Sequence, residues 1–178
     1  VRIPNAEIKE CFNDSIMESF NETMRRSNAN VHLAKALLSG DSEEAAEICQ
    51  NLLRSYVCLR AFASRGAPEI FYEAMLSTLL STCDGSEIGS LQVEPEAGSG
   101  YADIAFTDYD GRTGVVIELK VSRTEDGLSG AVKSALRQIS ERNYAEKFMR
   151  SSRVRKVVAV GLAFCGKICD CGSELLKG

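Results

Sequence analysis

The order of apolar and polar residues predicts a β-hairpin in the middle of the chain. Residues 113–121 are mainly aliphatic, which is typical of a buried strand. Residues 101–106 are also strand-like, and Asp108-Tyr-Asp-Gly111 between the two segments is a turn signal. We therefore expect residues 101–106 to fold back onto residues 113–121.

Two charged residues interrupt the aliphatic run of the second strand. Side chains alternate between the faces of a strand, so Glu118 and Lys120 project on one side while Leu119 enters the core. The hairpin would place Asp103 beside Glu118. Two adjacent carboxylates repel each other unless a cation lies between them, and Mg²⁺ or Mn²⁺ suits such oxygen ligands. The ordinary alternative is a turn aspartate next to a surface ion pair.

Helical periodicity dominates the first third of the chain. Apolar residues recur at helical spacing after Pro4, up to Met24. A short helix then ends at Ser39-Gly40, where glycine suits a left-handed cap, and Asp41 with Glu44 forms a capping-box pattern for a helix reaching about residue 60. This part is expected to be entirely helical.

A further amphipathic helix is predicted to start at Ala67-Pro68. Glu69 and Glu73 lie four residues apart on it and share one face. They are either solvated surface glutamates or a functional acid. The apolar side of this helix consists of Ile70, Phe71, Met75, Leu76, Leu79 and Leu80.

The remainder of the chain predicts further strands and one helix. Residues 91–93 suit a first strand before a turn at Gly98-Ser-Gly100, which lacks the phosphate-loop motif. Residues 131–149 suit a helix, and residues 157–164 suit a strand that would lie parallel to residues 113–121. The inward residues of the helix would be Val132, Ala135, Leu136, Ile139 and Tyr144.

The same helix carries the candidate contacts to nucleic acid. Gln138 is either an exposed surface residue without a functional role or a residue that contacts a phosphate or a bound water. Lys133, Arg137 and Arg142 begin the densest basic region, which is either a phosphate-contacting surface or a solvated helix face. Because the net charge is −4, attraction to nucleic acid must come from such a local patch or from metal-bridged phosphates.

Composition and cysteine usage indicate an ordinary globular protein inside the cell, in the cytoplasm or nucleus. The 178 residues are 44% hydrophobic and 26% charged, and they contain neither a transmembrane-length apolar run nor a secretory leader. Seven scattered cysteines are best explained as free thiols. A zinc site or a thiol enzyme is disfavoured, because the spacing lacks paired Cys-x-x-Cys and His32 is the only histidine.

Several blocks of the sequence resemble the PD-(D/E)XK nuclease superfamily, particularly the branch found C-terminal to AAA+-type ATPase-like domains. The resemblance covers nearly the whole chain, although no proline precedes Asp103, and Glu73 stands where this branch often has histidine. The matching blocks are Ile3-Pro-Asn5, Glu69-x-Phe71-Tyr72, Gly100-Tyr-Ala-Asp103, Ile117-Glu-Leu-Lys120, Ala135-Leu-Arg-Gln-Ile139 with Tyr144-Ala-Glu146, and Val160-Gly161 to Phe164 with Gly166-Lys167.

This resemblance implies an α/β (α+β) fold with a restriction-endonuclease-like core, in which helices flank a central mixed β-sheet. Residues 1–66 would be a helical connector or subdomain, and residues 67–178 the nuclease-like domain. It further implies that Asp103, Glu118 and Glu69 bind Mg²⁺ or Mn²⁺, that Lys120 activates or orients the attacking water, and that Gln138 assists.

Two functions follow as hypotheses. The first is a Mg²⁺-dependent nuclease acting on nucleic acid, with DNA favoured over RNA. The second is a catalytically silent nuclease-fold module that mediates protein–protein interaction or regulation, because a fold alone does not determine function. An ATPase domain or another protein is a possible partner, and no membrane is expected to be involved.

Overall fold

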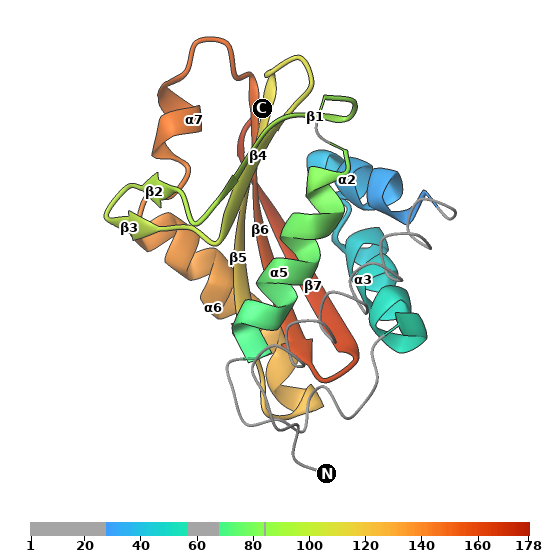
Figure 1. Cartoon of the computed structure of the whole chain (residues 1–178). Coiled ribbons are helices and arrows are strands. Elements are labelled where there is room, and N and C mark those ends of the chain that lie inside the picture. The colour runs from blue at the N-terminus through green and yellow to red at the C-terminus, as the bar shows by residue number, and fades with distance from the viewer. Residues whose placement is uncertain (1–27, 57–67, 84) are drawn as a thin grey trace, which may run out of the picture.

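The computed structural model describes residues 28–56, 68–83 and 85–178 (Figure 1). The helix expected before Met24 lies outside these residues. The helices are α2 (Ala29–Ser39), α3 (Ser42–Tyr56), α5 (Pro68–Ser81), α6 (Leu128–Glu141) and α7 (Glu146–Arg150), with a 3₁₀ turn at Glu125–Gly127. The strands are β1 (Ile88–Val93), β2 (Glu96–Ala97), β3 (Gly100–Tyr101), β4 (Ile104–Asp108), β5 (Thr113–Val121), β6 (Lys156–Cys165) and β7 (Ile168–Lys177).

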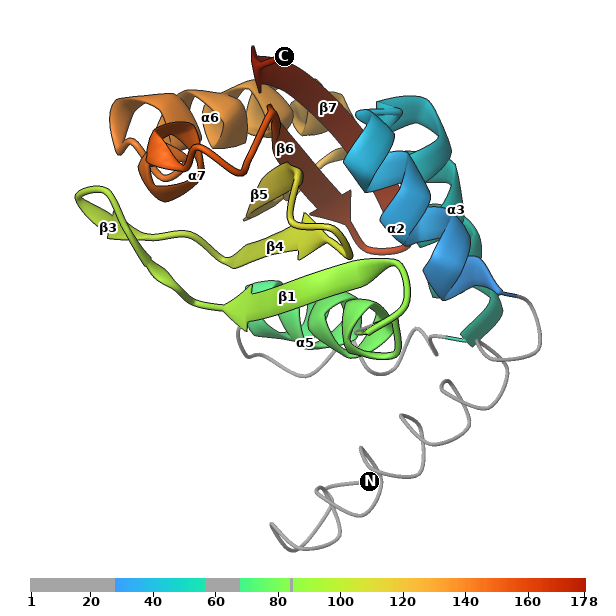
Figure 2. The ribbon, with the colours of Figure 1, turned by 90° about the horizontal axis from the view of Figure 1, so that it is seen from above.

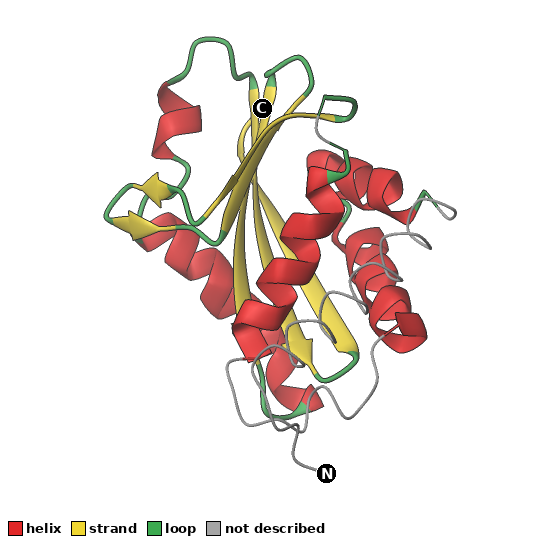
Figure 3. Cartoon of the chain, in the orientation of Figure 1, coloured by secondary structure: helices red, strands yellow, loops and turns green. Residues whose placement is uncertain are grey.

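Five strands form the central sheet, in the order β1-β4-β5-β6-β7 (Figure 3). The predicted hairpin is confirmed from residue 104 onward, because β4 pairs antiparallel with β5 and Ile104 lies opposite Ile117, whereas Tyr101 belongs to β3. The predicted parallel pair is also confirmed, since β5 runs parallel to β6 from Thr113 to Val121. The sheet is therefore mixed.

Helices cover both faces of this sheet (Figure 2). Side chains from α2, α3 and α5 form the larger core cluster with Val115, Ile117 and Leu119 of β5. Val116 points to the other face and packs with Ile139 of α6. The fold is therefore α/β with a central mixed sheet flanked by helices, as expected from the sequence.

The predicted helix boundaries in the first third are confirmed where they are described. Gly40 ends α2 in a left-handed conformation, with φ 85°. The Oδ1 atom of Asp41 accepts a hydrogen bond from the backbone N–H of Glu44 at 3.0 Å and so caps α3. Because α2 and α3 share one core cluster with the sheet, they pack directly onto it. The division at residue 66 falls outside the described residues and stays a prediction.

The prediction of one helix over residues 131–149 is wrong. Helix α6 ends at Glu141, Asn143 adopts a left-handed backbone with φ 55°, and α7 starts at Glu146. This turn brings Tyr144 into the core, where 6% of it is exposed. The apolar side predicted for α5 also needs a correction, since Ile70 is 65% exposed.

Two strand features were not expected. β2 and β3 form a separate two-stranded hairpin, and β7 pairs antiparallel with β6 over its full length. Helix α6 packs closely against β6 at Gly161, where an added Cβ would lie 2.8 Å from the carbonyl oxygen of Val132. Over the described residues, no helix has both the length and the apolar character needed to cross a membrane.

Candidate active site

The candidate site lies where β4 and β5 part. β5 continues to Val121, whereas β4 begins only at Ile104, so Asp103 stands just outside the paired region. The Oδ2 atom of Asp103 accepts a hydrogen bond from the backbone N–H of Leu119 at 2.6 Å. The carboxylate thus replaces a backbone carbonyl as the acceptor for an N–H of β5, beyond the last paired residue of β4. This hydrogen bond holds Asp103 next to Glu118.

Glu118 is a buried carboxylate with one unsatisfied oxygen. The residue is only 2% exposed. Its Oε1 atom accepts a hydrogen bond from the Nζ atom of Lys120 at 2.7 Å, whereas Oε2 is buried and has no hydrogen-bond partner among the described residues. An unpaired buried oxygen is costly, so Oε2 provides a position for a proton or a cation.

The pKa values of all three central groups, Asp103, Glu118 and Lys120, are raised. Burial, reinforced by the negative charge of Asp103, raises the pKa of Glu118 to about 7 despite the opposing hydrogen bond from Lys120. Burial also raises the pKa of Asp103. For Lys120, burial alone would lower the pKa, but the hydrogen bond and charge of Glu118 outweigh it and raise the pKa. Lys120 is therefore a protonated donor at neutral pH.

Further carboxylates surround this centre. Glu69 is exposed in the first turn of α5, and its negative charge acts on Asp103, Glu118 and Lys120. One turn later, burial and the charges of Glu94, Asp103 and Glu69 raise the pKa of Glu73. The sequence had indicated Glu73 as the partner of Glu69 on one helix face and as a departure from the family pattern, but not as a site residue.

Glu94 was not predicted as a site residue. It follows β1 and has φ 48°, an uncommon conformation for a residue other than glycine. Its backbone N–H donates a hydrogen bond to the carbonyl oxygen of Asp103 at 2.8 Å. Only the long-range approach of β1 to β4 brings it here, so no local sequence signal could have identified it.

Gln138 lines an open pocket together with Arg137 and Arg142. This open pocket of about 270 Å³ is lined by Ser134, Arg137, Gln138, Glu141, Arg142 and Tyr144. The Nε2 atom of Gln138 donates a hydrogen bond to the hydroxyl of Tyr144 at 3.2 Å. Lys133 is exposed on the same helix. The assisting role of Gln138 stays a prediction.

The carboxylates fit a divalent cation that keeps most of its water ligands. Within the described ranges, no group of three or more His, Cys, Asp or Glu side chains is arranged to hold a metal ion. Mg²⁺ commonly uses only one or two protein carboxylates together with water and substrate phosphate. Asp103 and Glu118, with the unpaired Oε2 atom, meet that smaller requirement.

The described cysteines are free thiols, and the surroundings of Cys169 and Cys171 disfavour the thiolate form. Cys49, Cys83, Cys165, Cys169 and Cys171 form no disulfide, whereas Cys11 and Cys58 lie outside the described residues. The hydrogen bond with Cys49, together with burial, raises the pKa of Cys169, and burial raises the pKa of Cys171. A thiolate nucleophile is therefore disfavoured in this cluster.

The protonation of Glu118 predicts how the stability of the metal-free chain depends on pH. Its pKa is about 7 in the folded chain, above the ordinary 4.5. Its stabilising effect is therefore complete below pH 4.5 and is lost as the pH rises through 7. Between pH 5 and pH 8, we expect the wild type to lose about 2–3 kcal/mol of unfolding free energy relative to Glu118→Gln.

Urea unfolding in EDTA at several pH values measures this difference. The raised pKa of Asp103 acts in the same direction at lower pH, and it is present in both proteins. Glu174→Gln serves as a control, because Glu174 is exposed on β7 and should leave the pH dependence unchanged. Parallel stability curves for the wild type and Glu118→Gln would contradict the assignment.

Comparison with known proteins adds a family match. A family model described as the PD-(D/E)XK nuclease superfamily matches residues 67–174. A search of curated proteins finds no match. Among solved structures, one described as "Crystal structure of SSO0001" aligns with 94% of this chain and 78% of its own chain, at 14% identity and a TM-score of 0.34. So low a TM-score supports no argument about fold or function.

Proposed function

The chain belongs to the PD-(D/E)XK nuclease superfamily, and from this premise we propose that it is a metal-dependent nuclease. It would hydrolyse phosphodiester bonds of nucleic acid inside the cell, with DNA favoured over RNA. The observation that carries the proposal is the buried Glu118 carboxylate, whose Oε2 atom is unpaired beside Asp103. A structural ion pair alone would not require the second carboxylate at this position.

Asp103 and Glu118 would hold Mg²⁺ or Mn²⁺, and the charge of the nearby Glu69 would strengthen the attraction. The bound cation would supply Lewis-acid stabilisation of phosphate charge and a more acidic water. The hydrogen bond to Leu119 fixes the carboxylate of Asp103 through Oδ2. The side chain of Asp103 is therefore oriented before any ligand arrives, which lowers the cost of ordering it on binding.

Lys120 would act as a hydrogen-bond donor. Its pKa is raised, so it is charged at neutral pH and a poor proton acceptor. It is 27% exposed at the side chain, which leaves its ammonium group accessible to water or to a phosphate oxygen. This supports orientation of the attacking water, or stabilisation of charge on the phosphate, rather than removal of a proton.

The wider assignment remains part of the proposal. The matching sequence blocks taken together favour the branch that occurs C-terminal to AAA+-type ATPase-like domains, although no proline precedes Asp103 and Glu73 replaces the frequent histidine. An ATPase domain would then be a partner, with residues 1–66 as the helical connector. Gln138 would assist from α6, and Lys133, Arg137 and Arg142 would contact the phosphate backbone.

Titration of the purified chain with Mg²⁺ or Mn²⁺, in the presence of labelled DNA and RNA, tests this function. We expect cleavage that begins only when metal is added. We also expect the metal to raise the midpoint of thermal unfolding without substrate, because a ligand that binds only the folded chain stabilises it. Absence of both effects would contradict the proposal and favour the silent interaction module.

A further inference from the structure

The β2–β3 hairpin stands apart from the central sheet and next to the candidate site. It comprises Glu96–Ala97 and Gly100–Tyr101, and it forms a sheet of its own. Figure 2 shows it extending outward past the ends of β1 and β4 that connect to it. Asp103 follows it after a single intervening residue, so the hairpin borders the carboxylates directly in the chain.

The hairpin is anchored to the C-terminal end of α6. The backbone N–H of Ser99 donates a hydrogen bond to the carbonyl oxygen of Arg142 at 3.0 Å. Gly98 has φ 55°, and an added Cβ there would overlap the same carbonyl oxygen. At Gly100, an added Cβ would lie 3.1 Å from the hydroxyl of Tyr144. The position of the hairpin is therefore defined by close backbone packing.

This anchored hairpin carries an exposed aromatic ring. Tyr101 is 63% exposed, although a large ring usually gains by burial. It pairs with Glu96 across the hairpin, and Glu94 lies just before β2. The negative charge of Glu96, which lies opposite the ring, disfavours a phosphate there, whereas the face of a nucleobase is uncharged and stacks on aromatic rings.

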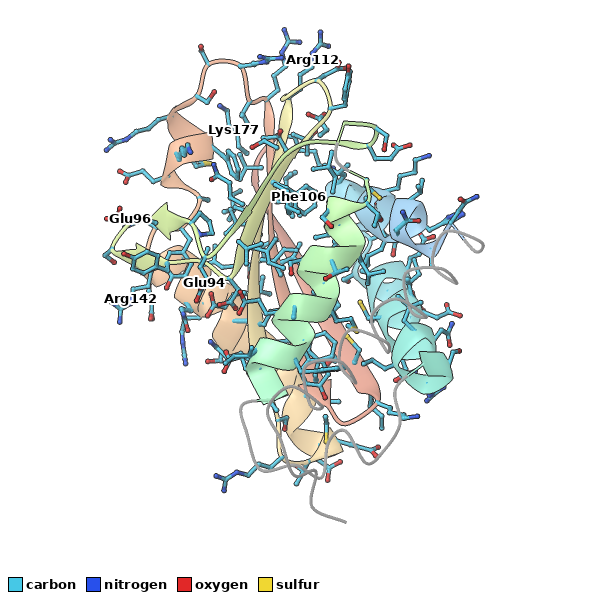
Figure 4. All side chains as sticks on the ribbon, viewed as in Figure 1. Glu94, Glu96, Phe106, Arg112, Arg142 and Lys177 are labelled. Atoms are coloured by element: carbon cyan, nitrogen blue, oxygen red, sulfur yellow. The ribbon has the colours of Figure 1, made fainter. Side chains whose placement is uncertain are left out.

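Positive charges lie near the end of α6 to which the hairpin is anchored. Arg137 and Arg142 line the pocket that Tyr144 also borders, and the hydroxyl of Tyr144 faces Gly100. Figure 4 shows Arg142 on the same side of the molecule as Glu94 and Glu96. The hairpin with the exposed ring of Tyr101 is thus anchored directly to the helix end that carries the two arginines, and this combines an aromatic surface with positive charge, as binding of base and phosphate groups requires.

We propose that the β2–β3 hairpin and the C-terminal end of α6 form a subsite for an unpaired nucleotide, with Tyr101 stacking on the base and Arg137 and Arg142 contacting phosphate. The inference rests on the proposed nuclease function and specifies its substrate class as single-stranded nucleic acid. Inside a duplex, neighbouring bases cover both faces of each base. Away from the ends of a duplex, only an unpaired base can offer a face to Tyr101.

Binding in EDTA tests this subsite without any cleavage. The full chain is titrated into a labelled single-stranded DNA oligonucleotide containing 2-aminopurine, and anisotropy and 2-aminopurine quenching are recorded. We expect Tyr101→Ala to weaken binding by about fivefold to a hundredfold and to abolish the quenching, as loss of one base stack would. Tyr101→Phe should retain both signals, because the ring remains.

Tyr109→Ala is the matched control. Tyr109 is also 63% exposed, but it lies in the β4–β5 turn at the opposite end of β4 from Asp103. Figure 4 shows Arg112 of that turn far from Arg142. This substitution should leave both signals unchanged. Arg142→Gln should lower the slope of log K against log salt by about 0.7, the contribution of one phosphate contact on a single strand.

Three outcomes would overturn the subsite: equal affinity and quenching for wild type and Tyr101→Ala, tighter binding of blunt duplex than of single strands, or an equal effect of Tyr109→Ala. Its failure can be separated from failure of the nuclease function. A chain that cleaves in Mg²⁺ but is indifferent to Tyr101 contradicts only the subsite. A chain that binds single strands through Tyr101 but never cleaves contradicts only the nuclease.

Discussion

Replacing Lys120 with methionine is expected to reduce metal-dependent cleavage by about a hundredfold to a thousandfold, the usual cost of removing one positioned donor from a site where charge develops. Methionine keeps most of the length of the side chain but removes the ammonium group, which donates a hydrogen bond to Glu118 at 2.7 Å. The rate is measured with a single-turnover cleavage assay at saturating metal.

Controls separate this effect from a loss of folding. Lys120→Met leaves Glu118 buried without its partner, so urea unfolding and metal-free binding of DNA should be recorded beside the rate. Lys35→Met is the matched surface variant, since the Lys35 side chain is 59% exposed on α2 and its 3.5 Å ion pair with Glu87 is solvated. If Lys120→Met folds, binds DNA and cleaves at the wild-type rate, the proposed role of Lys120 is wrong.

Replacing Gly161 with valine is expected to lower the unfolding free energy by about 3 kcal/mol. The new Cβ would lie 2.8 Å from the carbonyl oxygen of Val132 and 3.1 Å from the Cβ of Ala135. Both atoms belong to α6, whose backbone cannot retreat without losing its packing on β6. Equilibrium urea unfolding measures the change.

The same substitution at Gly130 provides the comparison. Gly130 lies in α6, the helix that packs on Gly161, but no atom approaches its added Cβ within 4 Å. Valine there should change stability by less than about 0.5 kcal/mol, because its helix propensity is slightly better than that of glycine. Equal losses at Gly161 and Gly130 would show that close packing of α6 on β6 does not explain the effect.

The local pattern predicted the central hairpin because its information lies in adjacent residues. Alternation along β5 separates Leu119 from Glu118, and the turn between β4 and β5 fixes which residues face each other. The family resemblance then implied that Asp103 and Glu118 bind a divalent metal ion. In contrast, the 2% exposure of Glu118 depends on α6 and its surroundings, which no spacing in β5 reveals.

Elements with weak local signals were missed. β7 contains cysteine, glycine and serine, which have little preference for a strand, and its pairing with β6 supplies the stability that its composition lacks. The β2–β3 hairpin has only two residues in each strand. It depends on contacts with Arg142 and Tyr144, which are distant in sequence, so its position could not be read from the glycine-rich turn alone.

The mixed pairing of β5 has a consequence for the order in which the chain folds. Its antiparallel partner β4 is joined by a short turn, and such hairpins form within about 1–10 μs. Its parallel partner β6 is separated from it in the sequence by α6 and α7, and such non-local pairing is slow. Asp103 and Glu118 therefore meet early in folding, before α6 docks and brings the arginines to the same side. A nascent chain would gain its acidic centre first and its affinity for nucleic acid last.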